Sequence, residues 1–70
     1  MDKIFDLLNQ YGIRDYCKVI CTSELLYSIE FRYKNYYTTF CFLEHEFDNP
    51  TTFYYINNII ANLADIVKAF

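Results

Sequence analysis

Residues Leu25–Leu43 decide the fold, and their sequence is LLYSIEFRYKNYYTTFCFL. Large apolar side chains occupy every second position of the first half, which is the period of a half-buried β-strand. The pair Lys34-Asn35 predicts a two-residue turn, after which the chain returns as a second strand. One face of this hairpin is nearly all aromatic or aliphatic, in these cross-strand pairs: Leu25 with Glu44, Tyr27 with Phe42, Ile29 with Phe40, Phe31 with Thr38, and Tyr33 with Tyr36. A slip of one residue would turn this face outward, so the sequence specifies the register.

A further strand is expected over Tyr16–Thr22, which is rich in residues that favour β-structure. A tight loop over Thr22–Glu24 would pair this strand with the hairpin, setting Cys21 opposite Leu25 and Val19 opposite Tyr27. Cys17, Val19 and Cys21 would then join the core face of the hairpin. A loop of another length would reverse the facing, and the apolar Ile20 on the other face keeps both alternatives open.

Two amphipathic helices flank the strands. The first is expected over Asp2–Tyr11, with Asp2 favouring its start, and Gly12 is expected to end it in a Schellman motif that folds Ile13 onto Leu8. Asn49-Pro50 predicts the N-cap and first residue of a second helix of about 20 residues. Its apolar stripe comprises Phe53, Ile56, Ile60, Leu63, Val67 and Phe70, widened by Tyr55, Ile59 and Ile66, with Asn57, Asn58, Asp65 and Lys68 on the wet side.

These elements predict a single α+β domain over residues 1–70, in the order α-β-β-β-α. The three strands form an antiparallel sheet, and a short N-terminal and a long C-terminal helix pack on one face of it. A domain of this size has a stability of roughly 4–10 kcal/mol.

Composition limits the function. The formal net charge of −3 and six scattered basic residues argue against a general binder of nucleic acid. The chain has no apolar run of membrane-spanning length and no signal-peptide pattern, and its three cysteines, an odd number, fit a reducing compartment, so we expect a cytoplasmic protein that binds no membrane. Phe, Tyr, Ile, Asn and Lys make up 33 of 70 residues, which indicates an AT-rich genome such as that of a low-GC bacterium or its phage.

Four residues have spacings that resemble a zinc site, namely Cys17, Cys21, Cys41 and His45. Residues four apart on a strand are separated by about 13 Å, too far to share one zinc ion, so we expect structural thiols instead. The acidic stretch Glu44, Glu46 and Asp48 beside His45 suggests an acid/base cluster or a weak cation site, but a solvated acidic loop is the simpler interpretation. No nucleophile pairs with the single histidine, so we expect no enzyme, no metal and no cofactor.

The order α-β-β-β-α is also that of the double-stranded-RNA-binding domain, whose lysines at the start of the last helix are replaced here by Asn49–Tyr55. We therefore expect no direct contact with nucleic acid. Eight tyrosines are more than a small core hides with satisfied hydroxyls, and tyrosine is enriched at protein interfaces. The candidate partner-binding residues are Tyr36, Tyr37, Tyr54 and Tyr55 together with Glu44, Glu46 and Asp48. Half-exposed tyrosines that only cover the sheet remain the alternative.

In size, acidity, AT-rich residue usage and element order, the whole chain resembles the small anti-CRISPR and related anti-defence proteins of phages. The resemblance implies an inhibitor without enzymatic activity, which occupies a functional surface of a CRISPR-Cas effector in the host cell cytoplasm. The mild charge favours binding through tyrosines, or allosteric action, over mimicry of DNA. An alternative is a homodimer or assembly subunit, formed by the apolar stripe of the last helix or by the free edge of the sheet.

Overall fold

The computed structural model describes residues 2–69 and confirms the predicted hairpin. Strand β2 (Leu26–Tyr33) pairs antiparallel with β3 (Tyr36–Leu43), and every predicted pair from Tyr33 with Tyr36 to Tyr27 with Phe42 is observed. Lys34, the first residue of the turn, has a φ of +53°, a conformation that favours glycine. The cross-strand register therefore forms although the turn sequence is a poor one.

Strand β1 (Cys17–Cys21) completes the sheet beside β2, but the predicted loop was one residue out of place. Cys21 faces Tyr27 and not Leu25, because the Leu25 N–H donates to the Thr22 carbonyl at 3.0 Å and closes a turn there. Leu25 has a φ of +61° and is 50% exposed, so its predicted place on the core face was wrong. The register moves by two positions, which keeps Cys17 and Val19 on the core face.

Helix α1 (Asp2–Gln10) ends as the glycine predicts. Gly12 has a φ of +73°, its N–H donates to the Asn9 carbonyl at 3.0 Å, and the Ile13 N–H donates to the Leu8 carbonyl at 3.1 Å. These are the two hydrogen bonds of a Schellman motif, and Leu8 and Ile13 are both fully buried. The motif turns the chain from the helix into the short 3₁₀ helix η1 (Arg14–Tyr16), which leads into β1.

The segment after β3 is not a simple loop but the 3₁₀ helix η2 (Glu44–Asp48), which buries Phe47. Helix α2 (Pro50–Ala69) follows and begins at the predicted residue. Its N-cap is Asn49, whose Oδ1 accepts hydrogen bonds from the backbone N–H groups of Thr51 at 2.9 Å and Thr52 at 3.4 Å.

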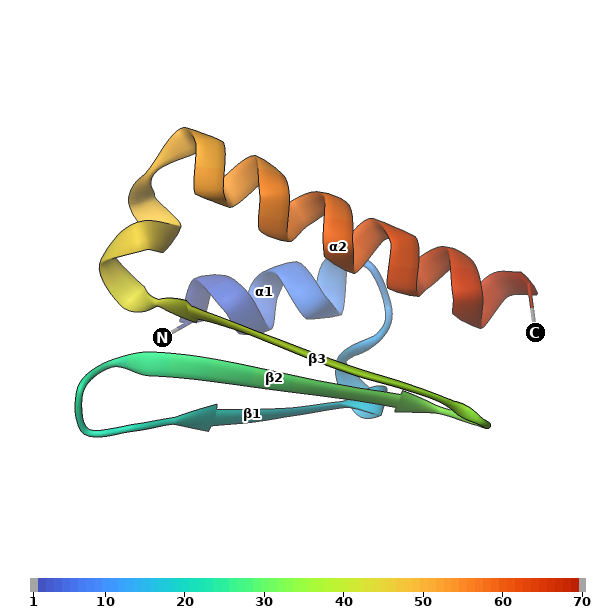
Figure 1. The fold of residues 1–70 in the computed structure, drawn as a ribbon. Helices are drawn as coiled ribbons and strands as arrows, with labels where there is room; N and C mark the ends of the chain where they lie inside the picture. The colour runs from blue at the N-terminus through green and yellow to red at the C-terminus, as the bar shows by residue number, and fades with distance from the viewer. Residues whose placement is uncertain (1, 70) are drawn as a thin grey trace.

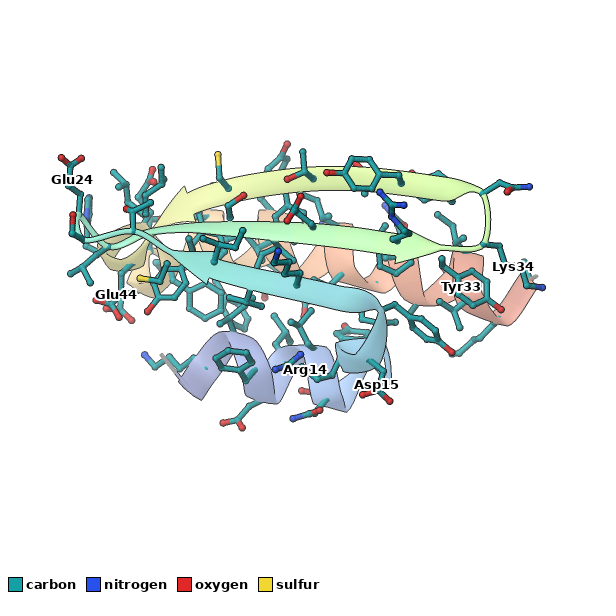
Figure 2. The ribbon with its side chains drawn as sticks, turned by 90° about the horizontal axis from the view of Figure 1, so that it is seen from below. Arg14, Asp15, Glu24, Tyr33, Lys34 and Glu44 are labelled. Carbon is teal, nitrogen blue, oxygen red and sulfur yellow. The ribbon has the colours of Figure 1, made fainter. Side chains whose placement is uncertain are left out.

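Both helices cover the same face of the sheet, and the other face is open (Figure 1). Seen from the open face, α1 lies along the β1 side, while α2 crosses behind the other two strands (Figure 2). The core between the layers consists of Ile4, Leu7, Leu8, Ile13, Cys17, Tyr27, Ile29, Phe31, Phe42, Phe47, Ile56, Ile60, Leu63 and Ala64. The predicted α+β fold, with a three-stranded antiparallel sheet and a short and a long helix, is thus confirmed.

The apolar stripe of α2 is narrower than predicted. Phe53 is 39% and Tyr55 68% exposed. Phe47 of η2 occupies the core at this end of the molecule, and Phe53 packs against its ring, with centroids 5.3 Å apart. Asn57, predicted on the wet side, is half-buried and accepts a hydrogen bond from the Tyr11 hydroxyl at 3.2 Å. Phe70 and the side chain of Asp2 lie outside the described residues. Within residues 2–69, neither helix is long and apolar enough to cross a membrane.

Candidate functional site

The structure divides the predicted partner-binding residues between two ends of the molecule. Glu44, Glu46, Asp48, Tyr54 and Tyr55 gather around η2 and the start of α2, which we call the η2 end. Tyr36 and Tyr37 follow the β2–β3 turn at the opposite end, near the last turns of α2, which we call the turn end (Figure 1). The seven residues therefore form no single patch.

Each acidic side chain of η2 has a partner within the chain. The Tyr27 hydroxyl donates to Glu44 at 3.2 Å, and the Leu43 N–H donates to Glu46 at 2.9 Å. Lys3 and Asp48 form an exposed ion pair at 2.8 Å. Burial raises the pKa of Tyr27 to about 12, and Cys21 and Glu44 act in the same direction, so this hydroxyl remains a donor at neutral pH. The interpretation of this stretch as a solvated acidic loop was therefore incomplete.

The η2 end also receives Glu24 from the β1–β2 loop, a residue that sequence reasoning missed. The Glu44 N–H donates to the Leu25 carbonyl at 2.9 Å, which ties this loop to the start of η2. Glu24 and Glu44 consequently lie at one end of the molecule, and Lys34 lies at the other (Figure 2). The negative charge is thus concentrated at the η2 end, although the charge of the whole chain is only −3.

Tyr54 and Tyr55 belong to different surfaces of the η2 end. Tyr54, 69% exposed, lines a shallow recess of about 450 Å³ together with Lys3, Phe47, Asp48, Pro50 and Phe53. Tyr55 lies on the side of α2 that faces β3. Neighbouring residues on a helix differ by 100° in direction, so the pair does not form one aromatic patch.

Tyr36 and Tyr37 point to opposite faces of the sheet, as neighbours on a strand must. Tyr36 contacts the Phe31 ring on the helix-covered face, with ring centroids 6.0 Å apart. Tyr37 lies on the open face, where its hydroxyl donates to Glu30 at 3.0 Å and its ring lies under the Arg32 guanidinium. The hydrogen bond to Glu30 raises the pKa of Tyr37. Tyr37 is thus held in place by its neighbours, while half of its surface remains exposed.

The outer backbone of β3 is a second candidate surface. The Glu44 N–H donates to the Leu25 carbonyl, so these two residues are a hydrogen-bonded pair, and such pairs recur at every second residue along β2 and β3. The backbone N–H and C=O groups of Thr38, Phe40 and Phe42 therefore face β2. The N–H and C=O groups of Tyr37, Thr39, Cys41 and Leu43 then point away from the sheet. Glu46 already accepts from the Leu43 N–H. We call the remaining outward groups, those of Tyr37, Thr39 and Cys41, the β3 edge.

An apolar groove of about 350 Å³ runs between β3 and α2 beside this edge. Its lining residues are Phe40, Cys41, Phe42, Glu46, Thr51, Thr52, Tyr55, Ile56 and Ile59. Tyr55 and Ile59, which the sequence placed in a widened stripe of the last helix, thus lie next to the free strand. The structure joins in one surface two features that the sequence offered as separate dimer contacts.

The cysteines lie on different parts of the sheet. Cys17 is buried, and burial raises the pKa of its thiol from 9.0 to about 11, so it is a neutral thiol at pH 7. Cys21 and Cys41 are exposed on the two outer strands, with β2 between them. Cys41 pairs with Ser28 and therefore faces the open side, opposite to Cys21, which pairs with Tyr27. Among residues 2–69 no three side chains of the His, Cys, Asp and Glu types come together as a metal site.

Fold and surfaces together define a small α+β chain with an acidic, tyrosine-bearing end and one free strand edge. In comparisons with known proteins, no family model, no curated protein and no solved structure matches this chain.

Proposed function

We propose that this chain is a protein-binding module that acts without catalysing a reaction. Its partner is a protein with a basic surface, and direct contact with nucleic acid or membrane is not part of the function. One observation carries the proposal: exposed Asp48 and Tyr54 line one recess at the η2 end, and exposed Glu24 lies at the same end of the molecule. Concentrated charge accelerates the encounter with an oppositely charged surface, and a tyrosine that enters a pocket of the partner slows dissociation.

The resemblance to anti-CRISPR proteins supplies the class of partner. We place the function in the cytoplasm of a host cell, where the chain would occupy a functional surface of a CRISPR-Cas effector. Effectors bind nucleic acid through positively charged channels, which an acidic end complements. The local concentration of charge supports this proposal better than the net charge of −3 does, because salt screens the interaction between exposed charges that lie more than about one Debye length apart.

Binding of the full chain to purified CRISPR effectors of several types, measured by biolayer interferometry over a range of salt concentrations, tests the proposal. Glu24→Gln with Asp48→Asn should slow association about 2–10-fold and weaken its salt dependence. Asp15→Asn with Asp65→Asn changes the net charge equally, away from the η2 end, and should leave association unchanged. Tyr54→Ala should speed dissociation about tenfold.

Three results would contradict the proposal. If none of the effectors binds the chain with sub-micromolar affinity, CRISPR-Cas effectors are not its partners. If the two double variants slow association equally, the η2 end is not the binding surface. Sub-micromolar binding of the chain itself to duplex or single-stranded nucleic acid at physiological salt removes the protein-directed function.

A further inference from the structure

The sequence of β3 is unusual for an exposed edge strand. Its eight residues, Tyr36–Leu43, contain no charged residue, no proline and no glycine, and they are mainly aromatic or β-branched. Soluble proteins usually protect such an edge with lysine, proline or a bulge, because the unpaired groups of a flat apolar strand recruit other chains. Here only the Leu43 N–H is protected, by Glu46.

We propose that the β3 edge pairs with the β3 edge of a second copy of this chain, in antiparallel orientation about a two-fold axis at Thr39. This register sets Thr39 against Thr39 and Tyr37 against Cys41 of the other copy. All outward groups of the β3 edge are then hydrogen-bonded, and the two sheets become one continuous sheet. An axis at Phe40 would instead need the Leu43 N–H, which Glu46 already occupies.

The side chains support pairing with the same sequence. On the open face, Thr39 meets Thr39. On the helix-covered face, Thr38 meets Phe40 and Tyr36 meets Phe42. Aromatic–aromatic, aromatic–β-branched and Thr–Thr pairs are among those that stabilise antiparallel strands, and no like charges face each other. The apolar groove beside the edge, with Phe40, Tyr55 and Ile59, receives the apolar side chains of the other copy.

Charge also fits two antiparallel copies. The two-fold axis brings the acidic η2 end of each copy beside the turn end of the other, which carries Arg32 on β2, Lys34 in the turn and Lys68 at the end of α2. Glu44 of one copy then lies next to Lys34 of the other. A parallel arrangement would set the two acidic ends together, and the antiparallel one avoids this repulsion.

Sedimentation of the purified full chain at 5 to 200 μM tests the proposal, with Thr39→Lys and Ile20→Lys as matched variants. The wild type should sediment as a dimer of two 8.5 kDa chains. Thr39→Lys sets two lysines against each other across the axis and should raise the dimer dissociation constant at least tenfold. Glu30 faces position 39 within one chain, so the monomer tolerates this lysine. Ile20→Lys adds the same charge on the same open face but on β1, and should leave the dimer intact.

Cross-linking supplies an independent measurement. In a Cys21→Ser, Cys41→Ser background, Thr39→Cys should form an interchain disulfide with oxidised glutathione, which is reduced as the two thiols are oxidised. Ile20→Cys in the same background should not. A wild type that remains monomeric at 200 μM overturns the proposal, and so does a dimer that Thr39→Lys leaves intact or that only Ile20→Cys cross-links. These outcomes do not bear on binding of an effector at the η2 end, which a monomer retains.

Discussion

The outer backbone of β1 is bound at its first residue, whereas that of β3 is bound only at its last. The Cys17 N–H donates to the Arg14 carbonyl, and the Arg14 guanidinium donates to the Cys17 carbonyl at 3.4 Å. On β3, the Glu46 carboxylate accepts from the Leu43 N–H at 2.9 Å. On β1, the Thr22 N–H donates to the Leu26 carbonyl, so the backbone groups of every second residue of β1 face β2. Besides Cys17, the residues of β1 whose backbone groups point outward are therefore Val19 and Cys21.

The two edges also differ in length and charge. Strand β1 has five residues, includes Lys18 and has α1 along its side, while β3 has eight uncharged residues and an apolar groove beside it. Short edges and lysines are common protection against pairing with other chains. The β1 edge is shorter and partly protected, whereas the β3 edge is longer and uncharged, and this difference is the reason that we propose pairing through β3.

The largest expected effect concerns the helix that forms the wall of the β3 groove. Ile60 is fully buried in α2, so Ile60→Ala should lower the free energy of unfolding by about 2–5 kcal/mol, a large share of the total. Urea denaturation followed by circular dichroism measures the loss. Ile20→Ala on β1 is the control, because Ile20 is 41% exposed, and its midpoint should stay close to that of the wild type. Equal midpoints for Ile60→Ala and wild type would mean that α2 does not cover the sheet.

Those parts of the fold that local signals determine were predicted from the sequence. Alternation specified the hairpin register, Gly12 the end of α1, and Asn49-Pro50 the start of α2. The β1–β2 loop was misplaced because the predicted loop, Thr22–Glu24, and the observed one, residues 23–25 between the hydrogen-bonded Thr22 and Leu26, both contain three residues. Both loops also put the same residues of β1 on the core face. The choice depends on Leu25 adopting a positive φ, which its residue type disfavours and which the Thr22 and Glu44 hydrogen bonds impose.

The candidate surfaces were less predictable, because they depend on contacts between residues far apart in the chain. The Glu44 carboxylate accepts a hydrogen bond from the Tyr27 hydroxyl, and Asp48 accepts one from Lys3, which is 45 positions away in the chain. No spacing rule reveals such pairs. Tyr54 and Tyr55 were both candidate partner-binding residues, but Tyr55 was also assigned to the apolar stripe of the last helix, where it is 68% exposed. Their separation onto two surfaces was not predicted, although the 100° step of a helix is the signal that would have revealed it. An uncharged run from Tyr36 to Leu43 was the available signal for the β3 edge.

An intermediate effect is expected at the caps of the two edges. Glu46→Ala removes the acceptor for the Leu43 N–H and should cost about 0.5–2 kcal/mol, as other lost caps do. Glu46→Gln keeps an acceptor oxygen and should cost less. Arg14→Ala removes the longer contact to the Cys17 carbonyl and the contact with the Phe5 ring, and should cost about 1 kcal/mol or less. Chemical denaturation of the three variants measures the order, and a larger loss for Arg14→Ala than for Glu46→Ala would reverse the assignment of the stronger cap.

The smallest effect is on the pH dependence of stability, where the buried thiol of Cys17 on β1 is compared with the exposed thiol of Cys41 on β3. Burial raises the pKa of Cys17 from 9.0 to about 11, so the folded state favours the neutral thiol. The stabilisation from this group is fully present below pH 9 and is lost as pH rises through 11, because the unfolded chain ionises first. Between pH 8 and 10 the loss should reach about 1 kcal/mol, before Tyr27 with its pKa near 12 contributes fully. Cys17→Ala should reduce this pH dependence of the urea midpoint, whereas Cys41→Ala, at an exposed position of β3, should leave it as in the wild type. If both variants keep the full pH dependence, Cys17 is not the titrating group. The contrast between a buried thiol on β1 and an exposed thiol on β3 would then have no effect on stability.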